Sequence, residues 1–175
     1  MKNIAKLLLL STLFLFFTIP ALAQNERPTS TAEERSLAVK LARLLESEPF
    51  HKEAKKGREW FTLWLIKVPD ISIEVCMGYM EPVVKDKKNF SSEIFTQMMF
   101  SSAAFIIEHP DQAKDSVAVN LAGLEGALKT YESILKEKPK AKWDHLDGLI
   151  AKREKGELRA FVEEVIKTKC KTKLN

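Results

Sequence analysis

Apolar side chains recur every three or four residues along most of the chain beyond residue 30, which is the spacing of one face of an α-helix. Thr31 stands three residues before Glu34, the spacing of a capping box that begins a helix. The first apolar series then consists of Leu37, Leu41, Leu44 and Leu45. The pattern therefore predicts a helix from Thr31 to about Glu46.

A second helix is predicted between two breaks that contain proline, Glu48-Pro49 and Val68-Pro69-Asp70. Trp60 and Trp64 are four residues apart and therefore lie on one face of this helix. At that spacing aromatic side chains belong to a core more often than to a ligand site. A ligand pocket lined by Trp60, Trp64 and Tyr79 stays open as an alternative.

The stretch from Ile71 to Met80 fits two kinds of secondary structure. Its first half alternates apolar and polar residues as a strand does, whereas Val75, Tyr79 and Val83 have the spacing of a helix. Because no partner strand is visible elsewhere in the sequence, we predict a helix for this stretch.

The most apolar segment after the N-terminus runs from Ile94 to Ile107. It is shorter than the roughly 20 residues that span a membrane, and it contains Thr, Gln and Ser residues. It therefore predicts a buried helix. Ser91 or Ser92 is expected to cap the start of this helix, and His109-Pro110-Asp111 to end it.

A fifth helix is predicted from a cap at Asp115 or Ser116 to Pro139. Its apolar positions step alternately by four and three residues, which gives a heptad-like seam. The seam consists of Val117, Leu121, Leu124, Leu128, Tyr131 and Leu135. Gly123 and Gly126 each cost up to about 1 kcal/mol in a helix interior, but they leave one side narrow enough for close helix approach. We therefore predict a central packing helix.

The last segment contains two apolar series separated by a break near Gly156, namely Leu146, Leu149 and Ile150, then Leu158, Phe161, Val162, Val165 and Ile166. With short connections between helices, the economical architecture is an antiparallel bundle. We therefore expect an all-α, single-domain antiparallel helical bundle with about five to seven helices in residues 31–170.

The N-terminus has the three parts of a secretory signal peptide. Lys2 and Lys6 give a positive start, an apolar run follows from Leu7 to Phe17, and Ala23 ends a small-residue cleavage site. We therefore expect residues 1–23 to be a signal peptide, residues 24–30 a flexible leader and residues 171–175 a basic tail. An uncleaved anchor is the alternative, but the apolar run is short for a membrane span. The protein is then secreted, to the periplasm if the source is a Gram-negative bacterium, and keeps no stable membrane anchor after cleavage.

Cysteine usage agrees with export. The chain contains two cysteines, Cys76 and Cys170. An even count in an exported chain favours one disulfide, which would tie the middle of the chain to its C-terminal helix. The alternative is two unpaired thiols.

Residue types common in catalytic sites are present without the spacing that such sites need. His51, His109 and His145 lie far apart, and the cysteines lack zinc-ligand spacing. Asp144, His145 and Asp147 cannot all face one ion from a regular helix. The sequence has no glycine-rich phosphate loop and no nucleophile elbow. We therefore predict no catalytic residues, no metal site and no cofactor.

The overall charge adds little to the functional picture. The chain has 28 basic and 24 acidic residues and a net charge of +4. The basic residues from Lys167 to Lys173 lack interleaved aromatic side chains, so we expect a solvated helix end and no nucleic-acid partner.

One short stretch resembles a repeat family. Ala127, Tyr131 and Pro139 have the spacing found in the second helix of a tetratricopeptide repeat. The first helix of that repeat and a following copy are both missing, and a lone repeat cannot bury its apolar face. We attribute this resemblance to chance.

A second resemblance involves a longer part of the chain. Cys76-Met77-Gly78-Tyr79, an apolar helix that ends at His109-Pro110-Asp111, and Ala127-Leu128 resemble small helical periplasmic immunity proteins against type VI secretion amidase toxins. The resemblance implies a disulfide-bonded helical protein that plugs the active site of a toxin. The chain lacks an additional cysteine of that family and continues past its usual end.

These observations favour a secreted, non-enzymatic helical protein that acts by binding a protein partner, with immunity as one special case. One alternative is a small-ligand or lipid carrier with a bundle cavity beside Trp60 and Trp64. The other is a hydrolase whose site is assembled from distant histidine and acidic residues.

Overall fold

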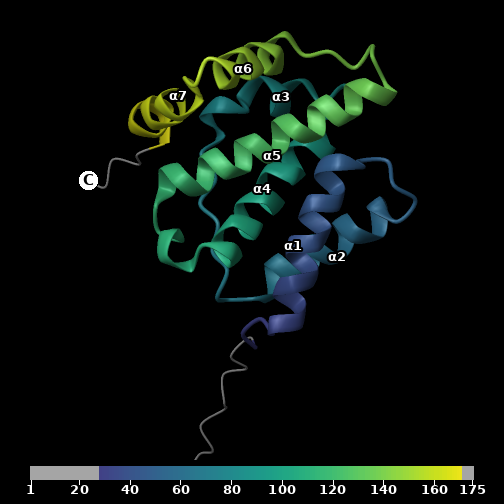
Figure 1. Ribbon diagram of the computed structural model, residues 1–175, viewed down its shortest axis with the longest axis vertical. Coiled ribbons are helices and arrows are strands. Elements are labelled where there is room, and N and C mark those ends of the chain that lie inside the picture. The colour runs from purple at the N-terminus through teal and green to yellow at the C-terminus, as the bar shows by residue number, and fades with distance from the viewer. Residues whose placement is uncertain (1–27, 171–175) are drawn as a thin grey trace, which may run out of the picture.

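The computed structural model describes residues 28–170, which form seven α-helices (Figure 1). These are α1 (Ala32–Ser47), α2 (Ala54–Lys67), α3 (Glu81–Asp86), α4 (Ser91–Glu108), α5 (Ser116–Glu137), α6 (Asp144–Glu154) and α7 (Leu158–Val165). The short turns are two 3-10 helices, η1 (Met77–Tyr79) and η2 (Pro110–Gln112), and a π-helix, η3 (Ile166–Cys170). The predicted signal peptide, most of the predicted leader and the predicted basic tail lie outside the described residues.

The two longest helices, α4 and α5, form the central pair of the bundle (Figure 1). Val119 of α5 lies beside Ser102 of α4, and Gly123 lies beside Met98, so the two helices run in opposite directions. Helices α1 and α2 pack on one side of this pair, and α3, α6 and α7 pack on the other. The expected all-α antiparallel bundle of five to seven helices is therefore confirmed.

The apolar side chains form two core clusters. The N-terminal cluster joins α1, α2 and α4, and it contains Phe61 stacked on Phe100 with ring centroids 4.1 Å apart. The C-terminal cluster joins α3 to α7 and includes the fully buried Leu128 and Tyr131. Helix α4 contributes to both clusters and thereby holds the two halves together. Within residues 28–170, no helix combines the length and the apolar character needed to cross a bilayer.

Two predicted helix starts are confirmed. Thr31 and Glu34 form the capping box, since the Glu34 amide donates to Thr31 Oγ1 at 3.1 Å and the Thr31 amide donates to Glu34 Oε2 at 2.8 Å. Asp115 Oδ1 accepts hydrogen bonds from the amides of Val117 and Ala118, both at 3.0 Å. Both caps satisfy backbone amides that lack a partner inside the helix.

The helix predicted from Ile71 to Met80 is wrong. Residues 71–76 form no regular secondary structure, and only η1 follows. Asn120 of α5 explains the difference, because its Oδ1 accepts from the Cys76 amide at 2.9 Å and its Nδ2 donates to the Glu74 carbonyl at 3.1 Å. One buried side chain thus supplies backbone partners that a neighbouring strand would otherwise supply.

The predicted serine cap of α4 is also wrong. The helix begins after Phe90, whose φ of 61° lies in the left-handed region, and no side chain caps it. Tertiary contacts hold this loop. The ring of Phe90 packs edge-on against Phe50 at 5.0 Å, Asn89 Nδ2 donates to the Lys142 carbonyl at 2.9 Å, and Trp143 Nε1 donates to the Asn89 carbonyl at 3.2 Å.

The predicted disulfide is present between Cys76 and Cys170, whose Cα atoms lie 5.6 Å apart. It joins the start of η1 to the end of η3. Gly78 makes this approach possible, since a Cβ at position 78 would lie 2.8 Å from Val165 Cγ1 and 3.0 Å from Lys169 Cδ. The Cys-Met-Gly-Tyr stretch therefore has a packing role at the contact between η1 and the C-terminal helix.

Ser30, the last residue of the predicted leader, is buried and belongs to the folded domain. Its amide and hydroxyl donate to the Asp70 carboxylate at 2.9 and 2.6 Å, and Arg35 donates to the same carboxylate at 2.6 Å. Burial alone would raise the pKa of Asp70, but the hydrogen bonds from Ser30 and Arg35 outweigh it and lower the pKa to about 2.

We expect Asp70→Asn to lower the free energy of unfolding by about 1 kcal/mol at neutral pH, since solvent screens this partly exposed cluster. A carboxylate with a lowered folded-state pKa stabilises the fold above its unfolded pKa of about 4. That contribution disappears as the pH falls toward about 2. The difference between wild type and variant, measured by urea unfolding, should shrink over this range. A difference independent of pH would contradict the role of the charge.

Candidate binding surfaces

The three aromatic residues of the possible ligand pocket lie in different parts of the core. Trp60 and Trp64 stack on each other in the N-terminal cluster, with ring centroids 5.7 Å apart. Tyr79 is fully buried in the C-terminal cluster, where its hydroxyl donates to Asn120 Oδ1. Burial raises the pKa of Tyr79, so its hydroxyl stays neutral. The two tryptophans and Tyr79 therefore do not meet in one pocket.

The seam of α5 faces the C-terminal cluster. Its fully buried members are Leu124, Leu128 and Tyr131, and its partly buried members are Val117, Leu121 and Leu135. Tyr131 also has polar contacts, because its hydroxyl donates to Asp147 Oδ1 at 2.8 Å and accepts from the Trp143 amide at 2.8 Å. Burial is the main cause that raises the pKa of Tyr131 to about 12. The seam thus positions the start of α6 against α5.

The three histidines contact different elements. His51 Nδ1 accepts from the Glu53 amide at 3.2 Å, the His109 ring lies 4.7 Å from Phe105, and His145 Nε2 lies 2.7 Å from the Tyr79 carbonyl. In the chain, His109 precedes α5 whereas His145 follows it, in the first turn of α6. Among residues 28–170, no three His, Cys, Asp or Glu side chains are grouped as metal ligands.

An apolar hollow of about 380 Å³ lies between α2, the segment that follows it and α4. We call it the α2 groove, and its lining includes Leu65, Ile66, Ile71, Ile73, Met99 and Phe100. Leu63 and Ile66 are 56% and 61% exposed. They are three residues apart and therefore share the outer face of α2. Clustered, exposed aliphatic side chains are typical of a surface that binds another protein.

The sequence reasoning missed this surface, although a signal was present. The chain from position 60 to 66 reads WFTLWLI, which has more apolar positions than one helix face can hold. Phe61 and Trp64 fill the core face, and Leu63 and Ile66 remain on the outside.

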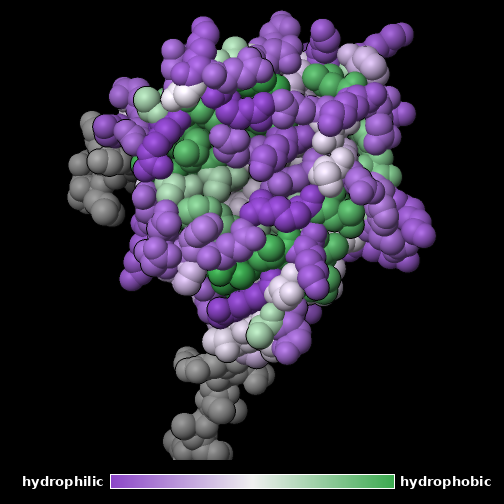
Figure 2. Space-filling view, in the orientation of Figure 1, coloured by the Kyte–Doolittle hydropathy of each residue, from purple (hydrophilic) through white to green (hydrophobic). Residues whose placement is uncertain are grey.

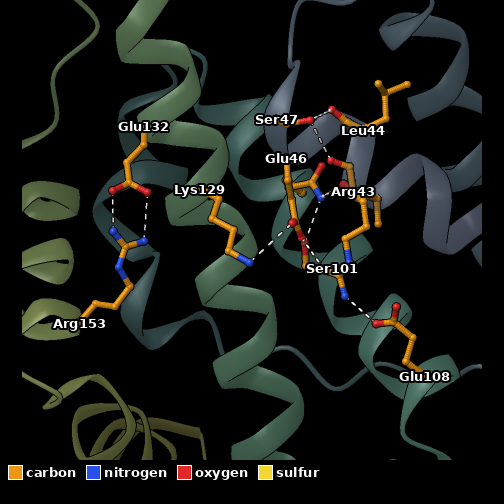
Figure 3. Close-up of polar contacts among 11 residues, drawn as sticks. Arg43, Leu44, Glu46, Ser47, Ser101, Glu108, Lys129, Glu132 and Arg153 are labelled. Carbon is orange, nitrogen blue, oxygen red and sulfur yellow. Dashed lines mark hydrogen bonds and ion pairs between the residues drawn. The ribbon is translucent and has the colours of Figure 1, made fainter.

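A second hollow, of about 400 Å³, lies between the C-terminal end of α1 and the C-terminal half of α5. We call it the α1–α5 cleft, and its lining includes Arg43, Glu46, Lys129, Glu132, Ser133 and Lys136. Charged side chains from both helices point toward one another here (Figure 3). Figure 2 shows hydrophilic residues over most of this face, with hydrophobic residues in several separate patches.

Glu46 is the buried acidic residue of the α1–α5 cleft, with a side chain only 7% exposed. Its Oε1 accepts hydrogen bonds from Ser101 Oγ of α4 and from Arg43 Nη1, both at 2.8 Å. Gln97 Nε2 donates to Ser101 Oγ and to the Ala42 carbonyl, both at 3.0 Å. This polar network links α1 to α4 inside the bundle and satisfies most of its buried groups.

Two cations approach Glu46 from opposite sides (Figure 3). Arg43 Nη2 also donates to Glu108 Oε2 at 2.6 Å. Burial would lower the pKa of Arg43, but Glu46 and Glu108 outweigh it and raise the pKa, so this guanidinium stays charged. Lys129 Nζ reaches across from α5 to within 3.9 Å of Glu46 Oε2.

The burial of Glu46 was also missed, although its spacing indicates the core face of α1. Ala38, Ala42 and Glu46 follow one another at intervals of four residues, and all three are buried. A carboxylate at such a position needs partners, and neither Ser101 nor Lys129 can be assigned to it before α4 and α5 are packed.

Comparison of the chain with protein-family models, with curated proteins and with solved structures gives no match. The functional conclusions therefore rest on the chemistry of the α2 groove and the α1–α5 cleft.

Proposed function

We propose that the protein acts outside the cytoplasm by binding another protein, and that the α2 groove is the surface it uses. The observation that carries this proposal is the exposure of Ile66 at an apolar hollow, together with that of Leu63 on the same outer face of α2. Fully burying one such side chain contributes roughly 1.5–3 kcal/mol. A partner that covers both side chains therefore gains a substantial part of its binding free energy at this one place.

The lining of the α2 groove supports a protein partner. Ile66, Ile71 and Ile73 surround it, and Met99 and Phe100 contribute from α4. Aromatic residues and Met are enriched in protein interfaces, and the buried centre of an interface is poor in charged residues. The groove offers this apolar centre on two regular helices and on the segment that follows α2.

The charge of α2 indicates which kind of partner segment fits. Residues 52–67 contain five basic and two acidic residues. A positive surface favours a partner of opposite charge and speeds its association. We therefore expect a partner segment that presents apolar side chains to the groove and acidic side chains beside them.

Two features support action outside the cytoplasm. The Cys76–Cys170 disulfide is typical of proteins in an oxidising compartment, and the N-terminal pattern predicts export. An immunity protein that covers a secreted toxin is one special case of this proposal, in which the partner is an enzyme that loses activity when bound.

Photo-cross-linking in the cells that make the protein tests the proposal. A benzophenone amino acid replaces Ile66 in one variant and Lys155, an exposed residue of the α6 C-terminus, in the control. We expect a dominant adduct with one other protein at position 66 and none at position 155. Mass spectrometry of the cross-linked peptide should identify an apolar segment with acidic flanks.

Leu63→Asp combined with a cross-linker at position 66 should abolish the adduct, because the acidic group repels the partner and removes apolar contact. Met77→Asp is the matched control, since Met77 is 40% exposed and lies on the other side of the bundle, beside the disulfide. An adduct of two copies of this chain, or a cross-linked peptide rich in Lys and Arg, would contradict the proposed partner.

A further inference from the structure

The acidic groups of the α1–α5 cleft are largely occupied by protein partners. Both oxygens of Glu132 accept hydrogen bonds from Arg153 of α6, at 3.0 and 2.5 Å (Figure 3). Glu46 Oε1 accepts from Ser101 and Arg43. These three carboxylate oxygens therefore have little capacity left for the basic groups of the cleft.

The ammonium groups of the cleft, in contrast, lack close carboxylate partners. Lys129 Nζ has Glu46 Oε2 as its nearest carboxylate oxygen at 3.9 Å, which is too long for a hydrogen bond. Within residues 28–170, Lys136 has no carboxylate within ion-pair distance. Lys129 and Lys136 are seven residues apart, so they lie about two turns apart on the same face of α5. Their open donors favour an anionic group between them.

One acceptor in the cleft is incompletely used by the protein. Within residues 28–170, Glu46 Oε1 accepts the hydrogen bonds of this side chain, and the nearest cation to Glu46 Oε2 is Lys129 Nζ at 3.9 Å. A carboxylate oxygen without a protein donor can accept a charge-assisted hydrogen bond from a bound ammonium group. This oxygen therefore favours a positively charged donor in the cleft.

We propose that the α1–α5 cleft binds a small zwitterionic molecule. Its carboxylate or phosphate group accepts hydrogen bonds from Lys129 and Lys136, and its ammonium group donates to Glu46 Oε2. The volume of about 400 Å³ lies within the range of small-molecule sites. The buried glutamate gives selectivity, because it attracts the ammonium group and repels a molecule that carries only negative charge.

This site is separate from the α2 groove. Its residues come from the end of α1 and from α5, whereas the groove is formed by α2, the segment after it and α4. Ile66→Asp, which should abolish partner binding, is expected to leave the zwitterion affinity unchanged. Failure of one proposal is therefore distinguishable from failure of the other.

Titration of the purified protein, followed by amide chemical shifts in NMR spectra, tests the site with four probes. Two probes are zwitterions: alanine carries an ammonium and a carboxylate group, and O-phosphoethanolamine carries an ammonium and a phosphate group. The other two probes are half-molecules: acetate has only a carboxylate group, and ethylammonium has only an ammonium group. We expect at least one zwitterion to give saturable shifts at Glu46, Lys129 and Ser133, with a Kd at least tenfold lower than that of either half-molecule. The better zwitterion identifies the preferred anionic group.

The double variant Lys129→Gln with Lys136→Gln should raise the Kd at least tenfold. Lys155→Gln with Lys167→Gln, which removes the same charge from exposed positions elsewhere, should leave it unchanged. Glu46→Gln keeps an acceptor for Ser101 and should remove the preference for the zwitterion over acetate. Any one of three results would overturn the proposal. The wild type could bind zwitterion and acetate with equal affinity, the two double variants could raise the Kd equally, or the chemical shifts could show no saturation at about 10 mM ligand.

Discussion

Removal of the Cys76–Cys170 disulfide should lower the free energy of unfolding by about 4 kcal/mol. The bond joins residues that are 94 positions apart. Closing a loop of this length removes much of the conformational entropy of the unfolded chain, and native disulfides typically contribute about 2–5 kcal/mol. The expected loss therefore lies in the upper part of that range.

The variant Cys76→Ala with Cys170→Ser measures this contribution by urea unfolding. Alanine suits position 76, which is buried in the C-terminal cluster, and serine suits the partly exposed position 170. We expect the midpoint of thermal unfolding to fall by roughly 10 °C. Amide hydrogen exchange should increase first in α7 and η3, which the bond ties to η1.

A reducing agent provides the control. It should destabilise the wild type by about as much as the double substitution does, and it should leave the variant unchanged. A variant within about 1 kcal/mol of the oxidised wild type would show that packing of η1 against α7 suffices without the bond.

Features that depend on local spacing were predicted from the sequence. The capping box at Thr31 and Glu34, the cap at Asp115 and the apolar side of α5 each need only residues within a few helical turns. The disulfide required one further expectation, that the chain is exported, because two cysteines then have a single possible pairing. These are the parts of the fold in which local chemistry and tertiary packing agree.

Features that depend on contacts between distant residues were not predicted. The segment before Cys76 does not form the predicted helix because Asn120, more than forty positions later, pairs with its backbone. The start of α4 is fixed by Phe50 on one side and Trp143 on the other, which override the serines that follow. In both places a tertiary contact outweighs a local preference.

The two binding surfaces fall between these cases. The excess of apolar residues in α2 and the spacing of Glu46 are visible in the sequence. The sequence does not reveal which elements complete each surface. Met99 reaches the α2 groove and Lys129 reaches Glu46 only after α4 and α5 have packed. A sequence can thus indicate that a side chain is unusual before it indicates what the side chain faces.

Gly126→Ala should lower the free energy of unfolding by about 2–3 kcal/mol. A Cβ at position 126 would overlap Oγ and Cβ of Ser101 and would lie 2.9 Å from Glu46 Oε1. The methyl group therefore separates α5 from α4 and disturbs the buried network of Glu46. Alanine by itself favours a helix over glycine by about 1 kcal/mol, so a net loss means that the packing cost exceeds this gain.

Gly148→Ala is the matched control for this substitution. Gly148 lies within α6, and a Cβ there would have no neighbour within 4 Å. We expect Gly148→Ala to leave the stability unchanged or to raise it by up to about 1 kcal/mol. Urea unfolding of both variants compares the same chemical change with and without a facing helix.

A compensating substitution separates steric overlap from other causes. Ser101→Gly removes both atoms that a methyl group at position 126 would overlap, although it also removes a hydrogen bond to Glu46. If close packing of α4 and α5 is the cause, Ser101→Gly with Gly126→Ala should be less destabilised than the sum of the two single variants. Strict additivity would show that the two positions do not share one space. The narrow side of α5 would then contribute to stability through its backbone rather than through its contact with α4.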